Sequence, residues 1–323
     1  MTPDLQTVRD AQERLSRYLP VTRLVEARSL SEATGAQVQL KLESDLPTGS
    51  FKVRGALQAL LVTLSRRPVR RVIASSTGNH GAAVAYAAQL LGIPATIFLP
   101  AGCNPVKRAR IASLGADIVD RGADLAAAWK LAAEAEGSTP DAFFLNDATD
   151  PDLPAGPGVI GLEILAQNPA VDTVIVPMGD TALIRGVGAA MKQIKPEVRV
   201  IGVQAERAPS YYLSWTSGKA IETETCDTIA DGLATRTPVD ANVHAIRTLV
   251  DRVVLVSERD MLHAIATLLF DEHVVAEPAG AAATAALLTH SGEIAGTGRN
   301  IVALVTGHNI APDVLRRAAR MSD

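Results

Sequence analysis

The 323-residue sequence has only two cysteines, no excess of positive charge and no polybasic run. Cys103 and Cys226 lie far apart and form no C-x-x-C motif, so neither a zinc site nor a disulfide framework is indicated. The formal net charge of −4 argues against a nucleic-acid partner, because binding to phosphate backbones depends on clustered Lys and Arg.

The sequence also has no uninterrupted apolar run of the roughly 18 residues that a membrane span needs. Its start, MTPDLQTVRDAQERLSRYLP, is typical of a charged amphipathic helix and has no apolar centre of a signal peptide. We therefore expect a cytoplasmic protein without a membrane partner. The length and the 47% hydrophobic content suffice for two lobes or one large α/β domain.

Short strand-like runs alternate with helical patterns along most of the chain. The runs are RRVIASS, ATIFLP, ADIVD, DTVIVP, VRVIGVQA, RVVLVS and IVALVT. This alternation predicts parallel sheets covered by helices. The segment DATDPDLPAGPG, near residues 147–158, is rich in Pro, Gly and Asp and is typical of a crossing between lobes.

One lysine stands at an unusual place, in LPTGSFKVRGA at residues 46–56. Most lysines are solvated surface groups, but here QVQLKLE predicts a strand before the lysine and FKVRGALQALLVTL predicts a helix after it. With Thr48 or Ser50 as N-cap, Lys52 falls in the first helical turn, where free N–H groups and the macrodipole disfavour a cation. We therefore expect a lowered pKa for Lys52, which would make its amine a nucleophile suited to imine chemistry.

Three further loops each follow a strand and open a helix, the place where open α/β sheets bind ligands. ASSTGNHG, residues 74–81, presents hydroxyls, an amide and consecutive N–H groups that suit a carboxylate, with a plain capped turn as the alternative. PMGDTALIRG, residues 177–186, offers Gly179 for a tight turn, and its N–H groups with the Thr181 hydroxyl suit a phosphate. TGHN, residues 306–309, indicates little by itself.

Other common nucleotide-binding and hydrolase motifs are missing. Gly186 and Gly188 form a G-x-G, but the third glycine of a dinucleotide-binding motif is absent and the pair lies inside a predicted helix. The sequence contains neither a G-x-x-x-x-G-K-[ST] phosphate loop nor the G-x-S-x-G elbow of serine hydrolases.

Together these segments resemble the pyridoxal-phosphate enzymes of the tryptophan synthase β-subunit fold (fold type II), and within them the serine/threonine dehydratase-like family. The matching segments, in order along nearly the whole chain, are PTGSFKVRGA, STGNHG, LPAGCNPVKRARIASLGADIV, AGPGVIGLEIL, PMGDTALIRG, TIADGLA, EPAGAA and TGHN. The resemblance implies a two-domain α/β protein with open, mostly parallel sheets and helices on both faces. It implies a large cofactor-binding domain over residues 1–67 and 152–323 and a small mobile domain over residues 68–151.

The resemblance also implies the site residues. Lys52 would carry pyridoxal 5′-phosphate as a Schiff base and, with Thr77, would act in catalysis. The residues that would contact the cofactor are Phe51, Lys52, Asn79, Gly179, Asp180, Thr181, Ala182, Leu183, Glu277 and Thr306, with Asn79 on the phenolic oxygen and Thr306 facing the pyridine nitrogen. Those that would hold the substrate carboxylate are Ser76, Thr77, Gly78, Asn79 and His80. No metal site is expected, because Gln204 and Ser210 stand where some relatives have carboxylate ligands.

The activity that the resemblance implies is β-elimination of water from L-threonine or L-serine, which gives a 2-oxo acid and ammonia, in a cytoplasmic homodimer. The alternatives are a replacement enzyme similar to threonine synthase or O-acetylserine sulfhydrylase, and an amino-acid racemase. Val53 follows the lysine where the replacement enzymes typically have Asp, which favours the dehydratase. A racemase needs a second acid–base group at Thr77, whose β-branched side chain we expect to be tied to the loop backbone. Since the chain ends at Asp323, no added regulatory domain is expected.

Two segments depart from the family pattern. In the phosphate loop, Asp180, Thr181 and Ala182 replace three of the usual four glycines. We expect Asp180 to point away from the phosphate or to pair with Arg185. His308 stands in place of a usual glycine, and we expect it to pack against its neighbours and not to enter the site.

Overall fold

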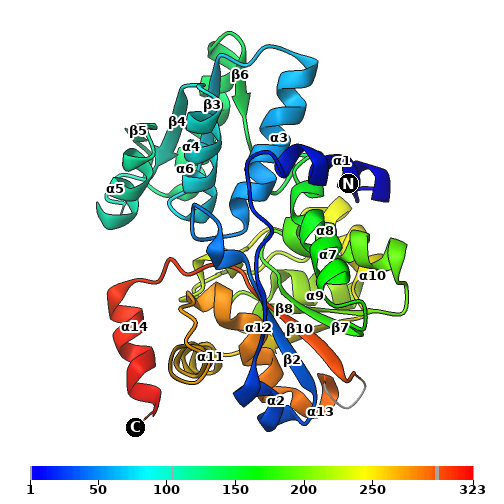
Figure 1. Ribbon diagram of the computed structural model, residues 1–323. Helices are drawn as coiled ribbons and strands as arrows, with labels where there is room; N and C mark the ends of the chain where they lie inside the picture. Colours follow the sequence, from blue (N-terminus) through cyan, green and yellow to red (C-terminus); the bar gives the residue numbers. More distant parts are fainter. Residues whose placement is uncertain (1, 104, 295–297, 323) are drawn as a thin grey trace.

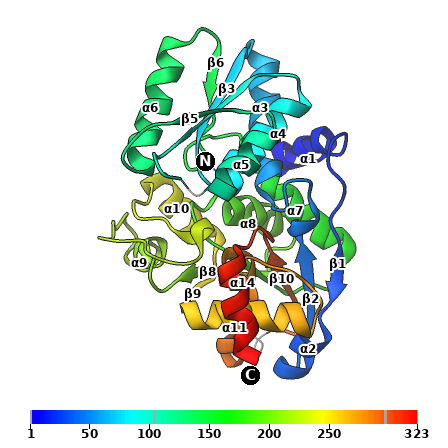
Figure 2. The ribbon, with the colours of Figure 1, turned by 90° about the vertical axis from the view of Figure 1, so that its left-hand side faces the viewer.

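Two sheets form the framework of the computed structural model, which describes residues 2–103, 105–294 and 298–322 (Figure 1). The six-stranded sheet has the order β1-β2-β10-β7-β8-β9, and the four-stranded sheet has the order β5-β4-β3-β6. Neighbouring strands pair in parallel except β1 and β2. The two sheets lie at opposite ends of the molecule in both ribbon views (Figures 1 and 2).

The strands follow the apolar runs of the sequence. They are β1 (Leu24–Glu26), β2 (Gln37–Leu42), β3 (Arg71–Ser75), β4 (Ala95–Leu99), β5 (Asp117–Asp120), β6 (Ala142–Phe144), β7 (Thr173–Pro177), β8 (Arg199–Ala205), β9 (Arg252–Val256) and β10 (Asn300–Val305). Strands β4 and β7 are buried at every residue, as continuous apolar runs in parallel sheets should be. The seven predicted runs are all strands, so this prediction is confirmed, whereas β1 and β6, of three residues each, were not predicted.

Helices cover both faces of each sheet. They are α1 (Leu5–Leu15), α2 (Arg28–Thr34), α3 (Lys52–Arg66), α4 (Asn79–Leu90), α5 (Pro105–Ser113), α6 (Leu125–Ser138), α7 (Ala155–Gln167), α8 (Ala182–Ile194), α9 (Ser210–Ser217), α10 (Asp240–Leu249), α11 (Glu258–Phe270), α12 (Pro278–Thr289), α13 (Ser291–Ile294) and α14 (Pro312–Ala319). In the six-stranded sheet, α7, α8 and α10 pack on one face, and α2, α11 and α12 pack on the other. In the four-stranded sheet, α3 and α4 share a core with one face and α6 covers the other. The predicted α/β architecture with covered parallel sheets is confirmed.

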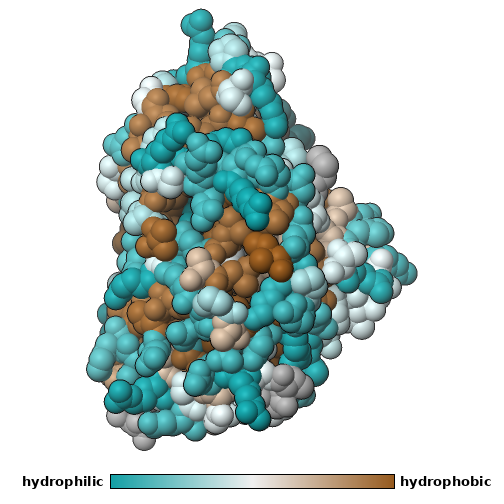
Figure 3. All heavy atoms as spheres, turned by 45° about the vertical axis from the view of Figure 1, so that its right-hand side comes forward, coloured by the Kyte–Doolittle hydropathy of each residue, from teal (hydrophilic) through white to brown (hydrophobic). Residues whose placement is uncertain are grey.

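Helix α3 connects the two parts of the molecule, because it packs against α4 beside the small sheet and against α7 beside the large one. The surface is mixed: Figure 3 shows brown apolar patches separated by hydrophilic side chains on one face. Within the described residues, no helix is both long enough and apolar enough to cross a membrane.

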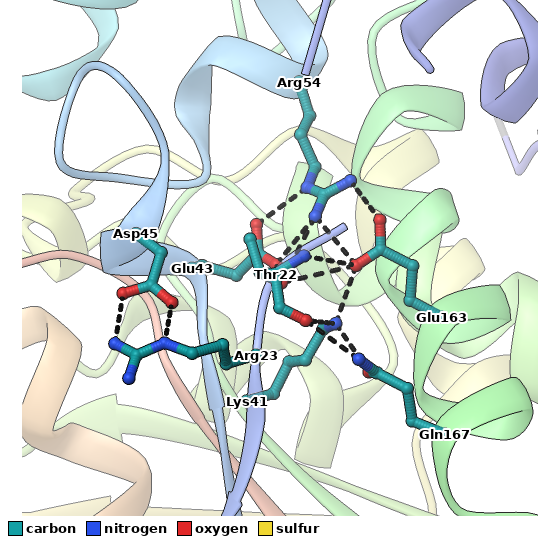
Figure 4. A network of polar contacts seen from close by, with 8 residues as sticks. All are labelled: Thr22, Arg23, Lys41, Glu43, Asp45, Arg54, Glu163 and Gln167. Carbon is teal, nitrogen blue, oxygen red and sulfur yellow. Dashed lines mark hydrogen bonds and ion pairs between the residues drawn. The ribbon is translucent and has the colours of Figure 1, made fainter. Parts of the chain in front are cut away.

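A buried group of charges anchors α3 two residues after Lys52 (Figure 4). The Arg54 guanidinium donates to Glu43 Oε2 at 2.8 Å and to Glu163 Oε1 at 2.8 Å, although its residue is only 1% exposed. Lys41, which is 0% exposed, donates to Glu163 Oε2 at 2.6 Å. The two cations balance the two carboxylates, so the group ties β2, α3 and α7 together without a net charge.

Candidate functional site

The first turn of α3 presents Lys52, and this helix packs against α4 beside the small sheet and against α7 beside the large one. Phe51 is the N-cap residue and already has helical angles, and no side chain caps the helix. The prediction that Thr48 or Ser50 is the N-cap is therefore wrong. The cause is tertiary: Ser50 pairs with Gly307 in an isolated β-bridge, and the Phe51 N–H donates to the Thr306 carbonyl at 3.0 Å.

The Lys52 ammonium is bonded to an acid that the sequence analysis did not identify. Its Nζ donates to Asp147 Oδ2 at 2.5 Å, and the two side chains are 16% and 17% exposed. Burial lowers the pKa of Lys52, but the carboxylates of Asp147, Asp180 and Glu277 outweigh burial, so the net pKa is raised. The expected lowering of the pKa is thus wrong for the cofactor-free chain, because these acids come from three distant segments.

Asp147 itself is held in its ionised form. Burial raises the pKa of its carboxyl, but the opposing effects of His80 and Lys52 are larger and lower it below the usual value. Asp147 follows β6, which pairs with β3, so the carboxyl ends of both strands bring their loops to one edge of the sheet. The sequence gives little indication that Asp147 follows a strand, because β6 has only three residues and is too short to recognise.

The loop after β3 forms the start of α4. Gly78 is the N-cap residue, and its N–H donates to Ser76 Oγ at 3.3 Å. The N–H groups of residues 79–81 donate to no protein acceptor in the described part of the chain, which leaves them available for an anion. Thr77 makes no hydrogen bond through its hydroxyl to any described residue, so the expectation that the loop backbone restrains this oxygen is wrong.

Asn79 and Glu277 meet across the site from different elements. Asn79 Nδ2 donates to Glu277 Oε1 at 2.6 Å, and Asn309 Nδ2 donates to Asn79 Oδ1 at 2.6 Å. Burial raises the pKa of Glu277 to about 7, although the bond from Asn79 and the charge of Arg110 oppose this rise. Asn309 lies in the predicted TGHN loop but was not singled out, and its amide fixes which way the Asn79 side chain points.

The loop after β7 opens α8 and has the features of an anion cradle. Residues 179–184 offer consecutive N–H groups that donate to no described protein acceptor. Gly179 is required by packing, since an added Cβ would lie 2.2 Å from the Gly232 carbonyl oxygen. Thr181 has a φ of +71°, an unusual conformation for a β-branched residue that stores strain beside a functional site. Ala182 and Leu183 form the buried first turn of α8.

Asp180 does not point out to solvent. It is half-buried and accepts a hydrogen bond from Thr235 Oγ1 at 3.1 Å. Burial, followed by the neighbouring Asp147 carboxylate, raises its pKa. Arg185 is 1% exposed, lies within electrostatic reach of Asp180, and donates from Nε to Thr181 Oγ1 at 3.1 Å. The expected pairing with Arg185 is therefore a longer-range attraction, and Thr235 is the direct partner.

The remaining predicted positions lie around this centre. Thr306 is 3% exposed, and its Oγ1 donates to the Ala279 carbonyl at 3.4 Å. His308 is exposed and lies against Gly49, where an added Cβ would meet its Nε2 at 2.4 Å. No group of three or more His, Cys, Asp or Glu side chains suited to a metal occurs among the described residues.

These elements fit pyridoxal phosphate. Lys52 lies within electrostatic reach of Glu277, the partner of Asn79, and it follows Phe51, whose N–H donates to the Thr306 carbonyl. The free N–H groups at the start of α8 match the needs of a phosphate. Within the described chain, Lys52 is hydrogen-bonded to Asp147 and acted on by the charges of Asp180 and Glu277, but it forms no hydrogen bond with Thr77.

Comparison with known proteins supports the same assignment. The chain matches the family described as "Pyridoxal-phosphate dependent enzyme" over residues 15–307. It is 38% identical over 313 residues to the L-threonine ammonia-lyase of Thermotoga maritima, covering 97% of this chain and 77% of that protein. The structure of maize serine racemase superimposes with a TM-score of 0.93 at 29% identity, covering 100% of this chain and 98% of that one. The processed form of threonine deaminase isoform 2 from Solanum lycopersicum gives a TM-score of 0.91 at 28% identity, covering 98% of this chain and 87% of that one.

Proposed function

Because the chain belongs to the family of pyridoxal-phosphate dependent enzymes, we propose that it removes water from a β-hydroxy amino acid and releases a 2-oxo acid and ammonia. The protein is a pyridoxal-phosphate-dependent lyase of the threonine ammonia-lyase type. The observation that carries this conclusion is the 38% identity with an L-threonine ammonia-lyase over nearly the whole chain.

We propose the cofactor contacts that the family resemblance implies. Lys52 would carry the cofactor, Phe51 and Asn79 would flank its ring, and Thr306 would face its pyridine nitrogen. The N–H groups of residues 179–183 would hold the phosphate, which the free donors at the start of α8 favour. Glu277 would keep Asn79 oriented toward the phenolic oxygen through their 2.6 Å bond. When bound, pyridoxal phosphate withdraws electrons from the substrate α-carbon.

Residues of the chain itself would bind the substrate and transfer the α-proton. The loop of residues 76–80 would bind the substrate carboxylate with its hydroxyls and free N–H groups, and so would orient the α-carbon. Lys52 would accept the α-proton and Thr77 would lie on the opposite face. The buried charges around Arg54 hold α3 in place, so that Lys52 keeps its position during proton transfer.

We propose that the two sheets are the centres of two domains. Residues 1–67 with 152–323 would form the large cofactor-binding domain, and residues 68–151 would form a small mobile domain. In this division the substrate loop after β3 and the lysine of α3 belong to different domains, so movement of one against the other would open and close the site. We also propose a cytoplasmic homodimer, with the apolar patches of Figure 3 as candidate contact surface.

The test is release of 2-oxo acid from a panel of β-hydroxy amino acids that includes L-serine and L-threonine. We expect turnover by the wild type and by Lys130→Ala, an exposed control, and none by Lys52→Ala. If no member of the panel yields a 2-oxo acid, the proposed function is wrong.

A racemase is the second candidate, because the superposition with maize serine racemase covers 100% of this chain. Chiral chromatography of the remaining amino acid separates the two activities. Elimination without matching inversion at the α-carbon supports the lyase.

A further inference from the structure

The site contains acids that the proposed roles do not use. Asp147 lies on the loop after β6 and has no counterpart among the cofactor or carboxylate contacts assigned above. In the cofactor-free chain it is bonded to the Lys52 ammonium at 2.5 Å. Asp180 adds a second carboxylate within electrostatic reach of the same ammonium. Both acids therefore surround a position that a cation occupies.

His80 places a second buried polar group beside Asp147. Its Nε2 donates to the Leu145 carbonyl at 3.0 Å, which leaves Nδ1 as the ring nitrogen that faces Asp147. Nδ1 has no hydrogen-bond partner among the described residues and lies 3.6 Å from Asp147 Oδ2, while His80 is only 6% exposed. A buried ring nitrogen without a hydrogen-bond partner and a buried carboxylate thus lie side by side, and a polar ligand between them would satisfy both groups.

Attachment of the cofactor changes this balance. Once Lys52 Nζ is bonded to the cofactor, it no longer supplies a free ammonium to Asp147, while the phosphate and the substrate carboxylate add negative charge. Among the described residues, Arg185 lies near Asp180, Arg110 lies near Glu277, and Lys107 pairs with Asp231. Arg185 donates to Thr181 Oγ1, and Arg110 donates to the Thr48 carbonyl. The Asp147 carboxylate thus loses its ammonium partner when Lys52 takes up the cofactor, and a cation of the substrate could replace that partner.

We propose that Asp147 and His80 form a subsite for an ammonium group on the γ-carbon of the substrate, with Asp180 adding to the attraction. The preferred substrate class is then a β-hydroxy-γ-amino acid of four carbons, such as 2,4-diamino-3-hydroxybutanoate. This inference rests on the proposed function. Lys52 acts at the α-carbon, and the γ-nitrogen is only three bonds from that atom. Asp147 lies within hydrogen-bond distance of Lys52 Nζ, so a group this close to the α-carbon can reach the Asp147 carboxylate.

The reaction balances without a further reactant. The α C–H and β C–O bonds break, a C=C bond forms, and the β-hydroxyl leaves as water with the proton. The released enamine tautomerises to an imine, and one water hydrolyses the imine to 4-amino-2-oxobutanoate and ammonia. The γ-ammonium is unchanged, so its role is recognition.

The experiment measures binding to the holoenzyme and needs no turnover. The probes are L-2,4-diaminobutyrate, L-2-aminobutyrate and L-aspartate, which share one chain length, lack the β-hydroxyl, and carry a positive, neutral or negative group at the γ-position. Calorimetry should give a Kd for diaminobutyrate at least about tenfold below that for aminobutyrate, with aspartate weakest, because bonds to a charged acceptor are the strong ones.

Two substitutions test whether Asp147 causes the preference for diaminobutyrate. Asp147→Asn should remove the preference for diaminobutyrate and leave the Kd of aminobutyrate within about twofold. Asp152→Asn is the matched control, because Asp152 lies on the same loop but pairs with the exposed Arg66, and it should keep the wild-type order. If Asp147→Asn does not bind cofactor, Asp147→Glu tests the same charge and should retain the preference.

Equal affinity for the three probes in the wild type overturns the inference, as does a preference that survives Asp147→Asn. Loss of affinity for all three probes in Asp147→Asn would assign Asp147 to positioning of Lys52, which also contradicts the subsite. The proposed function is judged separately, by 2-oxo acid release from any β-hydroxy amino acid, so the two ideas fail in different ways.

Discussion

Replacing Lys41 by Met should destabilise the fold strongly, because it leaves a carboxylate unbalanced in the interior. Lys41 is 0% exposed and donates to Glu163 Oε2 at 2.6 Å, to the Thr22 carbonyl at 2.8 Å and to Gln167 Oε1 at 2.8 Å. Its loss leaves Arg54 alone to balance Glu43 and Glu163. Removing one partner of a buried ion pair lowers the free energy of unfolding by about 3–5 kcal/mol, which is a large share of the roughly 5–15 kcal/mol of a typical protein.

A second substitution tests whether charge balance is the cause. In Lys41→Met with Glu163→Gln, the remaining Arg54 and Glu43 again sum to zero. The double variant should therefore lose less free energy of unfolding than the sum of the two single losses. Arg23→Met is the control: its bond to Asp45 is 2.7 Å long, but Arg23 is 67% exposed, so its loss should cost no more than about 1 kcal/mol.

The assay is urea unfolding of the four variants and the wild type, followed by circular dichroism at one pH and salt concentration. The reasoning is refuted if Lys41→Met costs no more than Arg23→Met, or if the losses in the double variant simply add. A loss of activity without a loss of stability would also contradict the account, since the group is assigned to anchoring α3.

Three further predictions concern the site. Turnover should survive a metal chelator, because buried Gln204 and Ser210 bond to the Tyr212 N–H and the Thr235 carbonyl and supply no carboxylate; loss that magnesium or calcium restores would contradict this. In the cofactor-free protein, Glu277 has a pKa of about 7 against an unfolded value of 4.5, so the folded state keeps a proton between these values. The free energy of unfolding should thus fall as pH rises from about 4.5 through about 7, and Glu277→Gln should flatten that slope in urea titrations. Elimination should outpace racemisation in the wild type, since the β-branch limits the rotamers of Thr77 even though no hydrogen bond to a described residue holds its hydroxyl; Thr77→Ser should raise inversion relative to 2-oxo acid release in chiral chromatography.

The strands, and the position of Lys52 at the start of a helix, could be predicted from the sequence, because each depends on a local pattern. Apolar runs of four to seven residues marked β7, β8 and β10, and the strand-to-helix transition placed Lys52 in the first turn of α3. The three-residue strands β1 and β6 carry too few residues to show a period.

The ionisation of the site could not be predicted, because it depends on contacts between distant segments. The raised pKa of Lys52 follows from Asp147, 95 residues away, and from Asp180. The buried partners of Arg54 come from two other elements, and nothing in the local sequence distinguishes Glu163 from a surface acid. The left-handed backbone conformation of Thr181 could not be predicted either, since it depends on the packing of the loop after β7 and not on the local sequence.

The most direct test of the central claim is to locate the cofactor on the chain. The purified holoenzyme is reduced with borohydride, digested, and analysed by mass spectrometry, with Lys52→Ala treated in parallel. The account predicts the reduced cofactor on the peptide that contains Lys52 and on no peptide of the variant. The reduced cofactor on another lysine of the wild type would contradict it.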